Sequence, residues 1–229
     1  MTGFSVNQRV SRVSSADVER FRTLPVAVVS DVMHRMVAGG AALRPMHDGT
    51  LLIGPAVTVR TRPGDNLMVH KALNMAEAGD VIVVDAGGDL TNAIIGELMV
   101  AFARQKRLGG MVINGAIRDS AEIAAGDFPV YAAGVTHRGP YKDGPGEVNS
   151  TISIGGMVVQ PGDLVMGDAD GVIAVPLAEV DAVFAAAKAK HESETRQMAA
   201  ILAGTNDRTW VERELLARGC AGVSAESDQ

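Results

Sequence analysis

Two apolar runs of strand length, separated by a segment of helix length, most constrain the fold of this chain. Residues 81–84 and 110–113 are short and almost continuously apolar, as strands buried on both faces are. Residues 96–108 between them have apolar side chains at helical spacing. Strands that alternate with helices are joined by crossovers and therefore run parallel. The middle of the chain thus predicts an α/β protein with a parallel sheet covered by helices.

The flanking segments extend this alternation. Residues 14–38 predict helix, which Pro25 breaks into two, with Ser14 and Asp17 in a capping pattern at its start. Further on we expect strands and helices in this order: a strand at 51–60, a helix at 65–78, a short helix at 120–125, a strand at 129–131, a Gly/Pro-rich loop at 134–150, strands at 156–159, 163–166 and 171–175, and a long helix at 177–202.

Length and composition favour one domain without a membrane span. The 229 residues suffice for a full hydrophobic core, and no Pro/Ser/Gly-rich linker divides them, so we expect a single domain over 1–229. No apolar run reaches the roughly 18 residues that a membrane span needs, and the N-terminus lacks the pattern of a signal peptide. The single cysteine, Cys220, fits a reducing compartment. We therefore expect a soluble cytoplasmic protein.

The charge balance disfavours nucleic acid as a partner. The formal net charge is −6, whereas phosphate binding needs clustered Lys and Arg. The nearest basic cluster is Arg104, Lys106 and Arg107. These side chains stand at the end of a predicted helix, where cations complement the helix dipole.

Two short segments concentrate the chemistry. Glu97 stands where a loop enters a helix, and backbone N–H groups at a helix start can bind a carboxylate. Asp119 follows a buried strand and a turn, which is where ligands bind in such units. One carboxylate with several waters suits Mg²⁺, and Arg118 beside it could bind an oxyanion. From spacing alone, a solvated Arg118–Asp119 ion pair and an exposed acid at the helix start for Glu97 are the more common arrangements.

Other motifs in the sequence do not indicate a specific function. Residues 83–89 superficially resemble the first motif of a methyltransferase, but Asp89 stands where a glycine is needed. The five histidines lack zinc spacing, and one cysteine cannot complete a structural site. His137 and Arg138 either contact an anionic substrate or lie at a solvated loop tip.

Four segments in order resemble a known family. They are residues 79–85 (GDVIVVD), 96–98 (GEL), 114–119 (NGAIRD) and 167–172 (GDADGV). The chain resembles the family of regulator of ribonuclease activity A and the 4-hydroxy-4-methyl-2-oxoglutarate / 4-carboxy-4-hydroxy-2-oxoadipate aldolases. Members are often labelled dimethylmenaquinone methyltransferase-like, which the motif at 83–89 does not support. The resemblance covers about residues 24–175, with a helical extension at about 177–218.

The resemblance implies a fold and an assembly. The fold would be a three-layer β/β/α sandwich of the swivelling-domain, RraA-like type. The assembly would be a homotrimer, or a hexamer of stacked trimers, with each active site at a subunit boundary.

The resemblance also implies a metal and substrate site. Asp119 would be the direct ligand of Mg²⁺ or Mn²⁺, and Arg118 would contact the pyruvate oxygen that becomes the enolate. Gly96, Leu98 and Met99 would form the binding site of the pyruvate carboxylate, the last two through their backbone.

Acidic residues would complete the implied site. Glu97 would position or deprotonate a water that acts as the base, although aldolases of this family carry Asp at its position. Glu122 would orient metal-bound water. An acid from the last long helix of a neighbouring subunit is also expected, with Glu192 the best match and Glu194 nearly as good.

The implied activity is that of a metal-dependent lyase that cleaves a 4-hydroxy-2-oxo acid to pyruvate and decarboxylates oxaloacetate. A Schiff-base route is disfavoured because the segments at 96–99 and 115–122 contain no lysine. One alternative is a non-catalytic regulator that binds a ribonuclease or another protein. Another is a lyase specialised on a different catabolic acid, which Glu97 makes plausible.

Overall fold

A ten-stranded sheet in the order β1-β8-β3-β4-β6-β7-β2, with three strands off this path, forms the frame of the protein. The structure is a computed structural model that describes residues 3–35 and 39–223. The end of the predicted helix, at 36–38, lies outside the described residues. The chain forms two compact units that divide after Lys188, and each is described by itself.

The centre of the sheet is parallel, as predicted. β4 (Val81–Asp85) pairs in parallel with β6 (Gly110–Ile117), and β6 pairs in parallel with β7 (Val130–Val135) and β5 (Ala93–Ile95). β6 is longer than predicted, so it delivers Arg118 directly at its end.

β3 (Leu52–Thr61) joins the parallel strands of the sheet to its antiparallel strands. Its first residues pair antiparallel with β11 (Leu164–Asp168), and from Ala56 on it pairs in parallel with β4. On the other edge of β3 lies β8 (Gly146–Val148), followed by β1 (Phe4–Val6), while β2 (Arg44–Pro45) pairs with β7.

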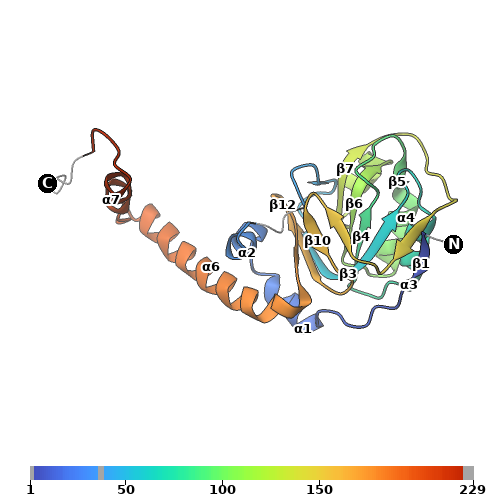
Figure 1. Cartoon of the computed structure of the whole chain (residues 1–229), viewed down its shortest axis with the longest axis horizontal. Helices are drawn as coiled ribbons and strands as arrows, with labels where there is room; N and C mark the ends of the chain where they lie inside the picture. The colour runs from blue at the N-terminus through green and yellow to red at the C-terminus, as the bar shows by residue number, and fades with distance from the viewer. Residues whose placement is uncertain (1–2, 36–38, 224–229) are drawn as a thin grey trace. The chain divides into compact units, whose positions relative to one another are not determined.

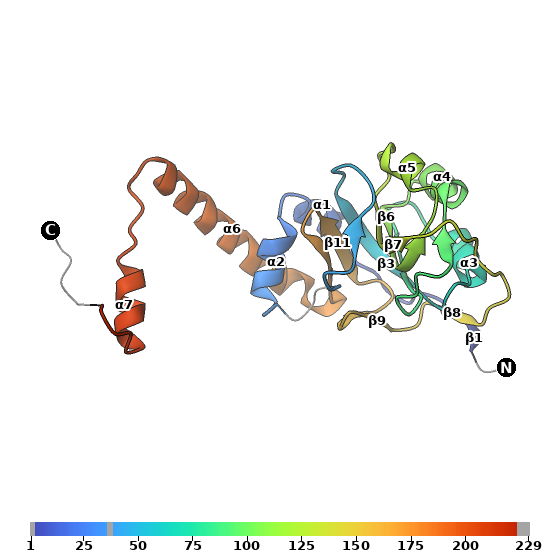
Figure 2. The ribbon, with the colours of Figure 1, turned by 90° about the horizontal axis from the view of Figure 1, so that it is seen from above.

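Helices cover one face of the parallel strands. α3 (Leu67–Met75), α4 (Glu97–Gln105) and α5 (Ser120–Ala124) are amphipathic or short helices whose buried sides meet the sheet. Their apolar side chains share one core with strand residues such as Ile82 and Ile113, which are fully buried. Figure 1 and Figure 2 show α3 and α4 together on this side.

A second β layer packs on the opposite face. It contains β11, the hairpin of β9 (Ile152–Ile154) and β10 (Met157–Val159), and β12 (Gly171–Val175), which pairs with β11. Its side chains form a core with those of β4, β6 and β7. The mixed α/β class and the β/β/α order are therefore confirmed.

A further helical cover lies outside this second β layer. α1 (Ser15–Phe21) and α2 (Val26–Val32) pack on β11 and β12 together with the short turn Leu177–Glu179 and the first residues of α6 (Val180–Leu202). Pro25 separates α1 from α2 as predicted. The Ser14 side chain caps α1 by accepting from the Asp17 N–H at 3.1 Å. This cover adds a layer to the three that the resemblance implies.

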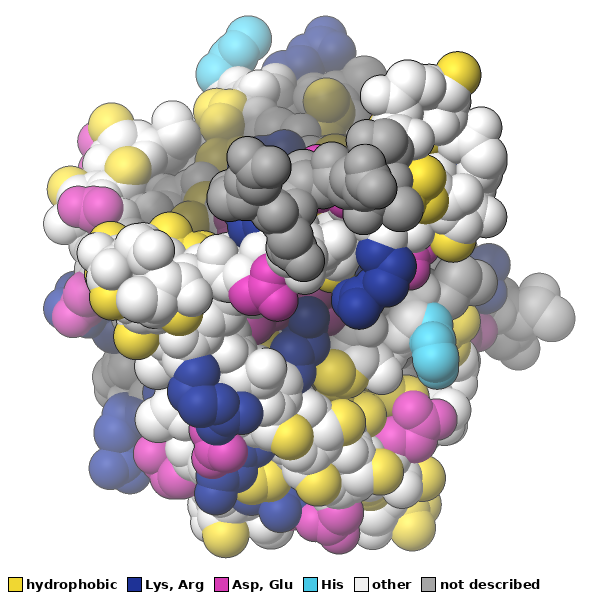
Figure 3. Space-filling view, turned by 90° about the vertical axis from the view of Figure 1, so that its left-hand side faces the viewer, with side chains coloured by type: hydrophobic (Ala, Val, Ile, Leu, Met, Phe, Trp, Pro, Cys, Tyr) yellow, Lys and Arg dark blue, Asp and Glu magenta, His cyan; other side chains and the backbone are white. Residues whose placement is uncertain are grey.

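The second unit contains the remainder of α6 and α7 (Trp210–Ala217). Several of its apolar side chains are exposed, among them Met198, Leu202 and Trp210. None of the helices in the described part of the chain combines the length and the hydropathy that crossing a membrane requires. Cationic and anionic side chains are interspersed on the face seen in Figure 3, rather than gathered in a patch of one sign.

Several short strands were not predicted, although β10 was, as the strand at 156–159. β5, β8 and β9 have three residues each, too few to show an alternating pattern, and β8 falls in the predicted Gly/Pro-rich loop. β5 matters for the candidate site because Gly96 follows its last residue.

Candidate active site

The carboxyl ends of two neighbouring parallel strands bring the two predicted segments together. Ile95, the last residue of β5, is in register with Ile117, the last residue of β6. The Arg118 N–H donates to the Ile95 carbonyl at 3.0 Å. Glu97 and Asp119 therefore lie side by side, although Asp119 comes 22 positions later in the sequence.

Asp119 has a left-handed backbone that turns its side chain back toward α4. Its φ is +55° and its ψ is +41°, a conformation that Asp tolerates better than most side chains. Asp119 Oδ2 accepts from the Glu97 N–H at 3.0 Å and lies 3.5 Å from Arg118 Nε. The start of α4 and the arginine thus both face the same carboxylate oxygen.

Gly96 is required by this close approach. A Cβ at Gly96 would lie 2.4 Å from Asp119 Oδ2 and 3.0 Å from Arg118 Cγ. Any larger residue would displace the carboxylate.

The start of α4 leaves one donor available. The Glu97 N–H is used by Asp119, and the Met99 N–H donates to the Gly96 carbonyl at 3.1 Å. Within the described chain, the Leu98 N–H has no hydrogen-bond partner. The Leu98 side chain is 80% exposed, so its backbone can be approached by a ligand.

A pocket of about 280 Å³ opens beside these groups. The predicted residues Gly96, Leu98, Met99, Arg118 and Asp119 line it. The remaining lining residues come from the start of α3, from the end of β5 and from the loop after β7, and are Asn66, His70, Ile94, Ile95, Gly139, Pro140 and Lys142.

Sequence reasoning missed Asn66, His70 and Lys142. α3 follows β3, which is parallel to β4, so the start of α3 was bound to reach the same sheet end. That signal could have drawn attention to Asn66 and His70. Nothing local distinguishes Lys142 from any other loop lysine. His137 and Arg138, the loop residues considered instead, are exposed and are not among the residues that line the pocket.

The pocket carries more cationic than anionic side chains. Arg118 and Lys142 are cations, while Asp119 is the one carboxylate among the described lining residues. Burial, and then the charge of Lys142, lower the pKa of His70 from its ordinary value of 6.5. Such a surface attracts an anion. Lys142 also brings to the pocket a lysine that the segments at 96–99 and 115–122 lack.

Asp119 fits a divalent cation. Its Oδ1 accepts no hydrogen bond from any described residue, so one carboxylate oxygen has no partner within the part of the chain that the structure describes. The described residues hold no group of three or more His, Cys, Asp or Glu that would form an all-protein cage. One carboxylate with waters is the donor set that Mg²⁺ commonly accepts.

The roles of the other acidic residues that the resemblance implies stay predictions. The side chains of Glu97 and Glu122 are exposed, and Glu122 stands three residues after Asp119 on α5. Glu192 and Glu194 lie in the second unit, where both are exposed and Glu194 pairs with Lys190 at 2.8 Å.

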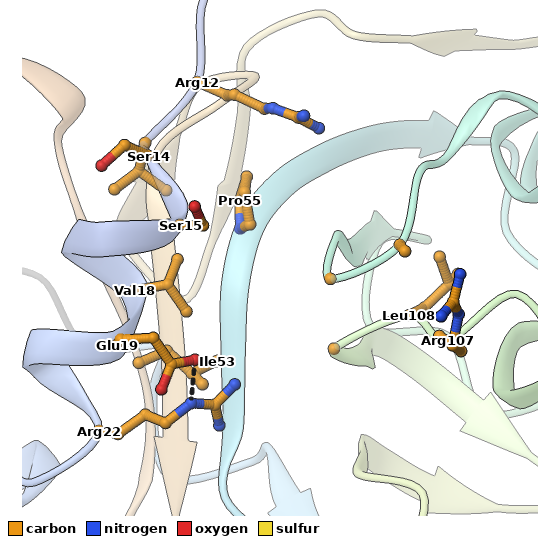
Figure 4. Close-up of a pocket in the computed structure, with 14 residues that line it drawn as sticks. Arg12, Ser14, Ser15, Val18, Glu19, Arg22, Ile53, Pro55, Arg107 and Leu108 are labelled. Carbon is orange, nitrogen blue, oxygen red and sulfur yellow. Dashed lines mark hydrogen bonds and ion pairs between the residues drawn. The ribbon is translucent and has the colours of Figure 1, made fainter.

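A larger cavity, of about 490 Å³, lies elsewhere in the first unit (Figure 4). It is bordered by α1, by β3 and by Gly79 and Gly109, which precede β4 and β6. Its Arg22 is paired with Glu19 at 2.8 Å. This is the amino end of the parallel strands, opposite to where such sheets bind ligands, so we assign the site to the smaller pocket.

Comparison with known proteins agrees with this architecture. Residues 26–174 match the RraA-like family, described as Aldolase/RraA. A protein of Halalkalibacterium halodurans, named "Putative 4-hydroxy-4-methyl-2-oxoglutarate aldolase", is 39% identical over 191 residues, which are 82% of this chain and 91% of that protein.

Two solved structures show the likeness in three dimensions. The RNA-processing inhibitor RraA from Thermus thermophilis is 30% identical, with a TM-score of 0.62 over 66% of this chain and 92% of its own. An uncharacterized protein from Pseudomonas syringae pv. tomato shares the fold, with 24% identity and a TM-score of 0.77 over 85% of this chain and 96% of its own. The chain therefore belongs to the RraA-like (Aldolase/RraA) family.

Proposed function

We propose that this protein is a divalent-metal-dependent lyase that cleaves a 4-hydroxy-2-oxo acid, of the 4-hydroxy-4-methyl-2-oxoglutarate type, to release pyruvate. The observation that carries the proposal is the meeting of Asp119, Arg118 and the free Leu98 N–H at one end of two parallel strands. These groups match the needs of a 2-oxo acid, which presents a carboxylate and a carbonyl oxygen side by side. The name of the relative from Halalkalibacterium halodurans supports the same reaction class.

The chain's own groups would bind and orient the substrate. The Leu98 N–H and the positive end of the α4 dipole would bind the carboxylate. Arg118 would donate to the 2-oxo oxygen, where negative charge develops when the C3–C4 bond breaks. Mg²⁺ or Mn²⁺ held by Asp119 would supply Lewis-acid stabilisation of that charge.

Acids in the first turns of α4 and α5 would move the protons. A water positioned by Glu97 or Glu122 would accept the proton of the 4-hydroxyl, the C3–C4 electron pair would pass into the three-carbon fragment, and C3 would then take a proton to give pyruvate. Oxaloacetate decarboxylation gives the same fragment, so we expect that activity as well. His70 and Lys142 would face the far end of the substrate, which is a second carboxylate in both compounds.

The assembly is part of the proposal. We expect a cytoplasmic homo-oligomer, a trimer or a hexamer, in which Glu192 or Glu194 of one subunit completes the site of another. Light scattering of the purified protein tests the oligomer, and mixing inactive Arg118→Ala chains with inactive Glu192→Gln chains tests the shared site. Recovered activity in the mixture would support it.

The direct test is pyruvate release from 4-hydroxy-4-methyl-2-oxoglutarate and from oxaloacetate, with Mg²⁺, with Mn²⁺ and with a chelator. Arg118→Ala should lose about 10²–10³-fold in kcat/KM, the usual effect of removing a donor to a developing oxyanion. Arg104→Ala is the matched control, because Arg104 is an exposed arginine of α4 whose partner is Asp127. Equal activity in both variants, or turnover that survives the chelator, would contradict the proposal.

The second candidate function is a non-catalytic regulator of a ribonuclease. It is favoured by the likeness to the RNA-processing inhibitor from Thermus thermophilis. Inhibition of a purified ribonuclease, together with no pyruvate release from either substrate, would favour this function over the lyase.

A further inference from the structure

The loop that carries Lys142 is fastened by one buried carboxylate. Asp65 is 0% exposed and precedes Asn66, the N-cap of α3. Its Oδ2 accepts from the Asp143 N–H at 2.8 Å and from the Gly144 N–H at 2.9 Å. Both donors immediately follow Lys142, so their placement fixes where that side chain starts.

The same carboxylate also fastens the other wall of the pocket. Asp65 Oδ1 accepts from the Leu67 N–H at 3.0 Å, at the start of the helix that carries His70. One buried group therefore joins the segment of Lys142 to the segment of His70, although 72 residues of sequence separate these two side chains.

Backbone hydrogen bonds strengthen this junction. The Tyr141 N–H donates to the Gly64 carbonyl at 2.8 Å, and the Asn66 N–H donates to the Tyr141 carbonyl at 3.0 Å. Arg62 Nη2 lies 3.0 Å from Asp65 Oδ2, and its guanidinium lies 5.6 Å from the centre of the Tyr141 ring. Three backbone N–H donors and one guanidinium explain how a carboxylate is kept in a buried place.

An amide could not replace this carboxylate. Asn at position 65 would retain one acceptor oxygen but would turn an NH₂ group toward backbone donors. The Leu67 N–H, or the Asp143 and Gly144 N–H groups, would then lose their acceptor, which weakens the attachment of the loop to α3 where Lys142 begins.

We infer that Asp65 is a positioning residue that holds Lys142 opposite His70 and so selects substrates with a second carboxylate. The inference rests on the proposed function for the identity of the substrate. The part of the inference that concerns the attachment of the Lys142 loop to α3 rests on the hydrogen bonds alone.

The test compares Asp65→Asn with a matched control, Asp80→Asn. Asp80 is also 0% exposed and also accepts from a backbone N–H (Glu77, 2.8 Å) and from an arginine (Arg9, 2.9 Å), but it stands directly before β4 and does not line the pocket. Two activities are measured: cleavage of 4-hydroxy-4-methyl-2-oxoglutarate, and exchange of the C3 protons of pyruvate in D₂O, which needs no second carboxylate.

We expect Asp65→Asn to raise KM for the cleavage substrate about tenfold, the size of one lost charge-assisted contact, and to alter KM for pyruvate exchange less than threefold. Asp80→Asn should change the ratio of the two KM values less than twofold. Equal changes in both activities would show that Asp65 serves folding alone and would overturn the inference.

A second measurement does not depend on turnover. NMR titration of His70 should show its pKa rising in Lys142→Met, because the neighbouring positive charge is removed. The pKa should rise in Asp65→Asn as well, and stay unchanged in Asp80→Asn. A rise in Lys142→Met without one in Asp65→Asn would overturn the inference, whereas a wild-type protein without turnover would refute the proposed function alone.

Arg62→Met is the replacement variant for this test if Asp65→Asn does not fold. It removes the exposed partner of Asp65 and the contact with Tyr141, and should move the KM ratio and the His70 pKa in the same directions by a smaller amount. No movement in either would count against Asp65 as a positioning residue.

Discussion

The backbone N–H of Glu97 donates to the carboxylate of Asp119 at 3.0 Å, so the first residue of α4 sets the direction of the side chain that follows β6. The donor stands at the positive end of the helix dipole, which favours a negative charge at this place. The other carboxylate oxygen accepts no hydrogen bond from the described residues, and Asp119 lines the pocket. A shift of either segment would therefore disturb both the metal site and the substrate site that we propose.

Gly96→Ala should lower kcat/KM at least tenfold with little loss of thermal stability. The new Cβ would lie 2.4 Å from Asp119 Oδ2, so the carboxylate must move, and misplacement of a reacting group is costly. Gly126→Ala is the control, because the nearest atom to its added Cβ is 3.5 Å away. Equal kcat/KM in the two variants would show that the approach of Gly96 to Asp119 is unimportant.

Asp119→Asn should bind Mn²⁺ at least tenfold more weakly than the wild-type protein. Asn tolerates the left-handed backbone at this position, so the fold is retained while the charge is removed. Electron paramagnetic resonance of free Mn²⁺ measures the affinity without any substrate. Asp127→Asn, an exposed carboxylate paired with Arg104, is the control. Unchanged Mn²⁺ affinity in Asp119→Asn would place the metal elsewhere.

Lys142→Met should raise KM for 4-hydroxy-4-methyl-2-oxoglutarate about tenfold through loss of one charge-assisted contact. Lys71→Met is matched to it, because Lys71 is also exposed and follows His70 on α3 without lining the pocket. Steady-state kinetics with both variants measure this KM. If Lys71→Met has the larger effect, Lys142 does not recognise the substrate.

Acidification should destabilise the protein partly through His70. Burial, and then Lys142, lower its folded pKa below 6.5, so the unfolded chain binds a proton first as the pH falls. The contribution of His70 to the free energy of unfolding is complete above pH 6.5 and is lost as the pH falls through the folded pKa. Urea unfolding at pH 7.5 and 5.5 should show a smaller difference in His70→Gln than in the wild type. An identical difference would mean that other groups cause the acid sensitivity.

Borohydride reduction in the presence of pyruvate should leave Lys142 unmodified. Lys142 is exposed, whereas a Schiff-base lysine is typically activated by desolvation or by a second cation beside it. Mass spectrometry of the intact chain detects a reduced pyruvate adduct. An adduct on Lys142 that forms in the presence of a chelator would replace the metal route with a covalent one.

Local sequence patterns were enough to predict the central parallel strands and about half of the residues that line the pocket. The apolar runs at 81–84 and 110–113 became the parallel strands β4 and β6, because burial on both faces demands such runs. Pro25 ended one helix before the next, since it lacks an N–H and fixes its backbone. The family motifs at 96–99 and 118–119 lie together in the structure, as the parallel alternation of strands and helices requires.

Only the tertiary structure decided the composition of the other half of the pocket. Asn66, His70 and Lys142 come from segments whose local patterns predict a helix start and a loop, and nothing in those patterns encodes their meeting. Their approach depends on strand order, on the three-residue strand β5 and on the buried carboxylate of Asp65, all of which are long-range packing relationships. Sequence by itself determines which residues are buried and how the backbone turns locally. The distances between remote side chains follow from how the buried faces pack together, because the burial of apolar surface is non-directional and leaves the pairing to the whole fold.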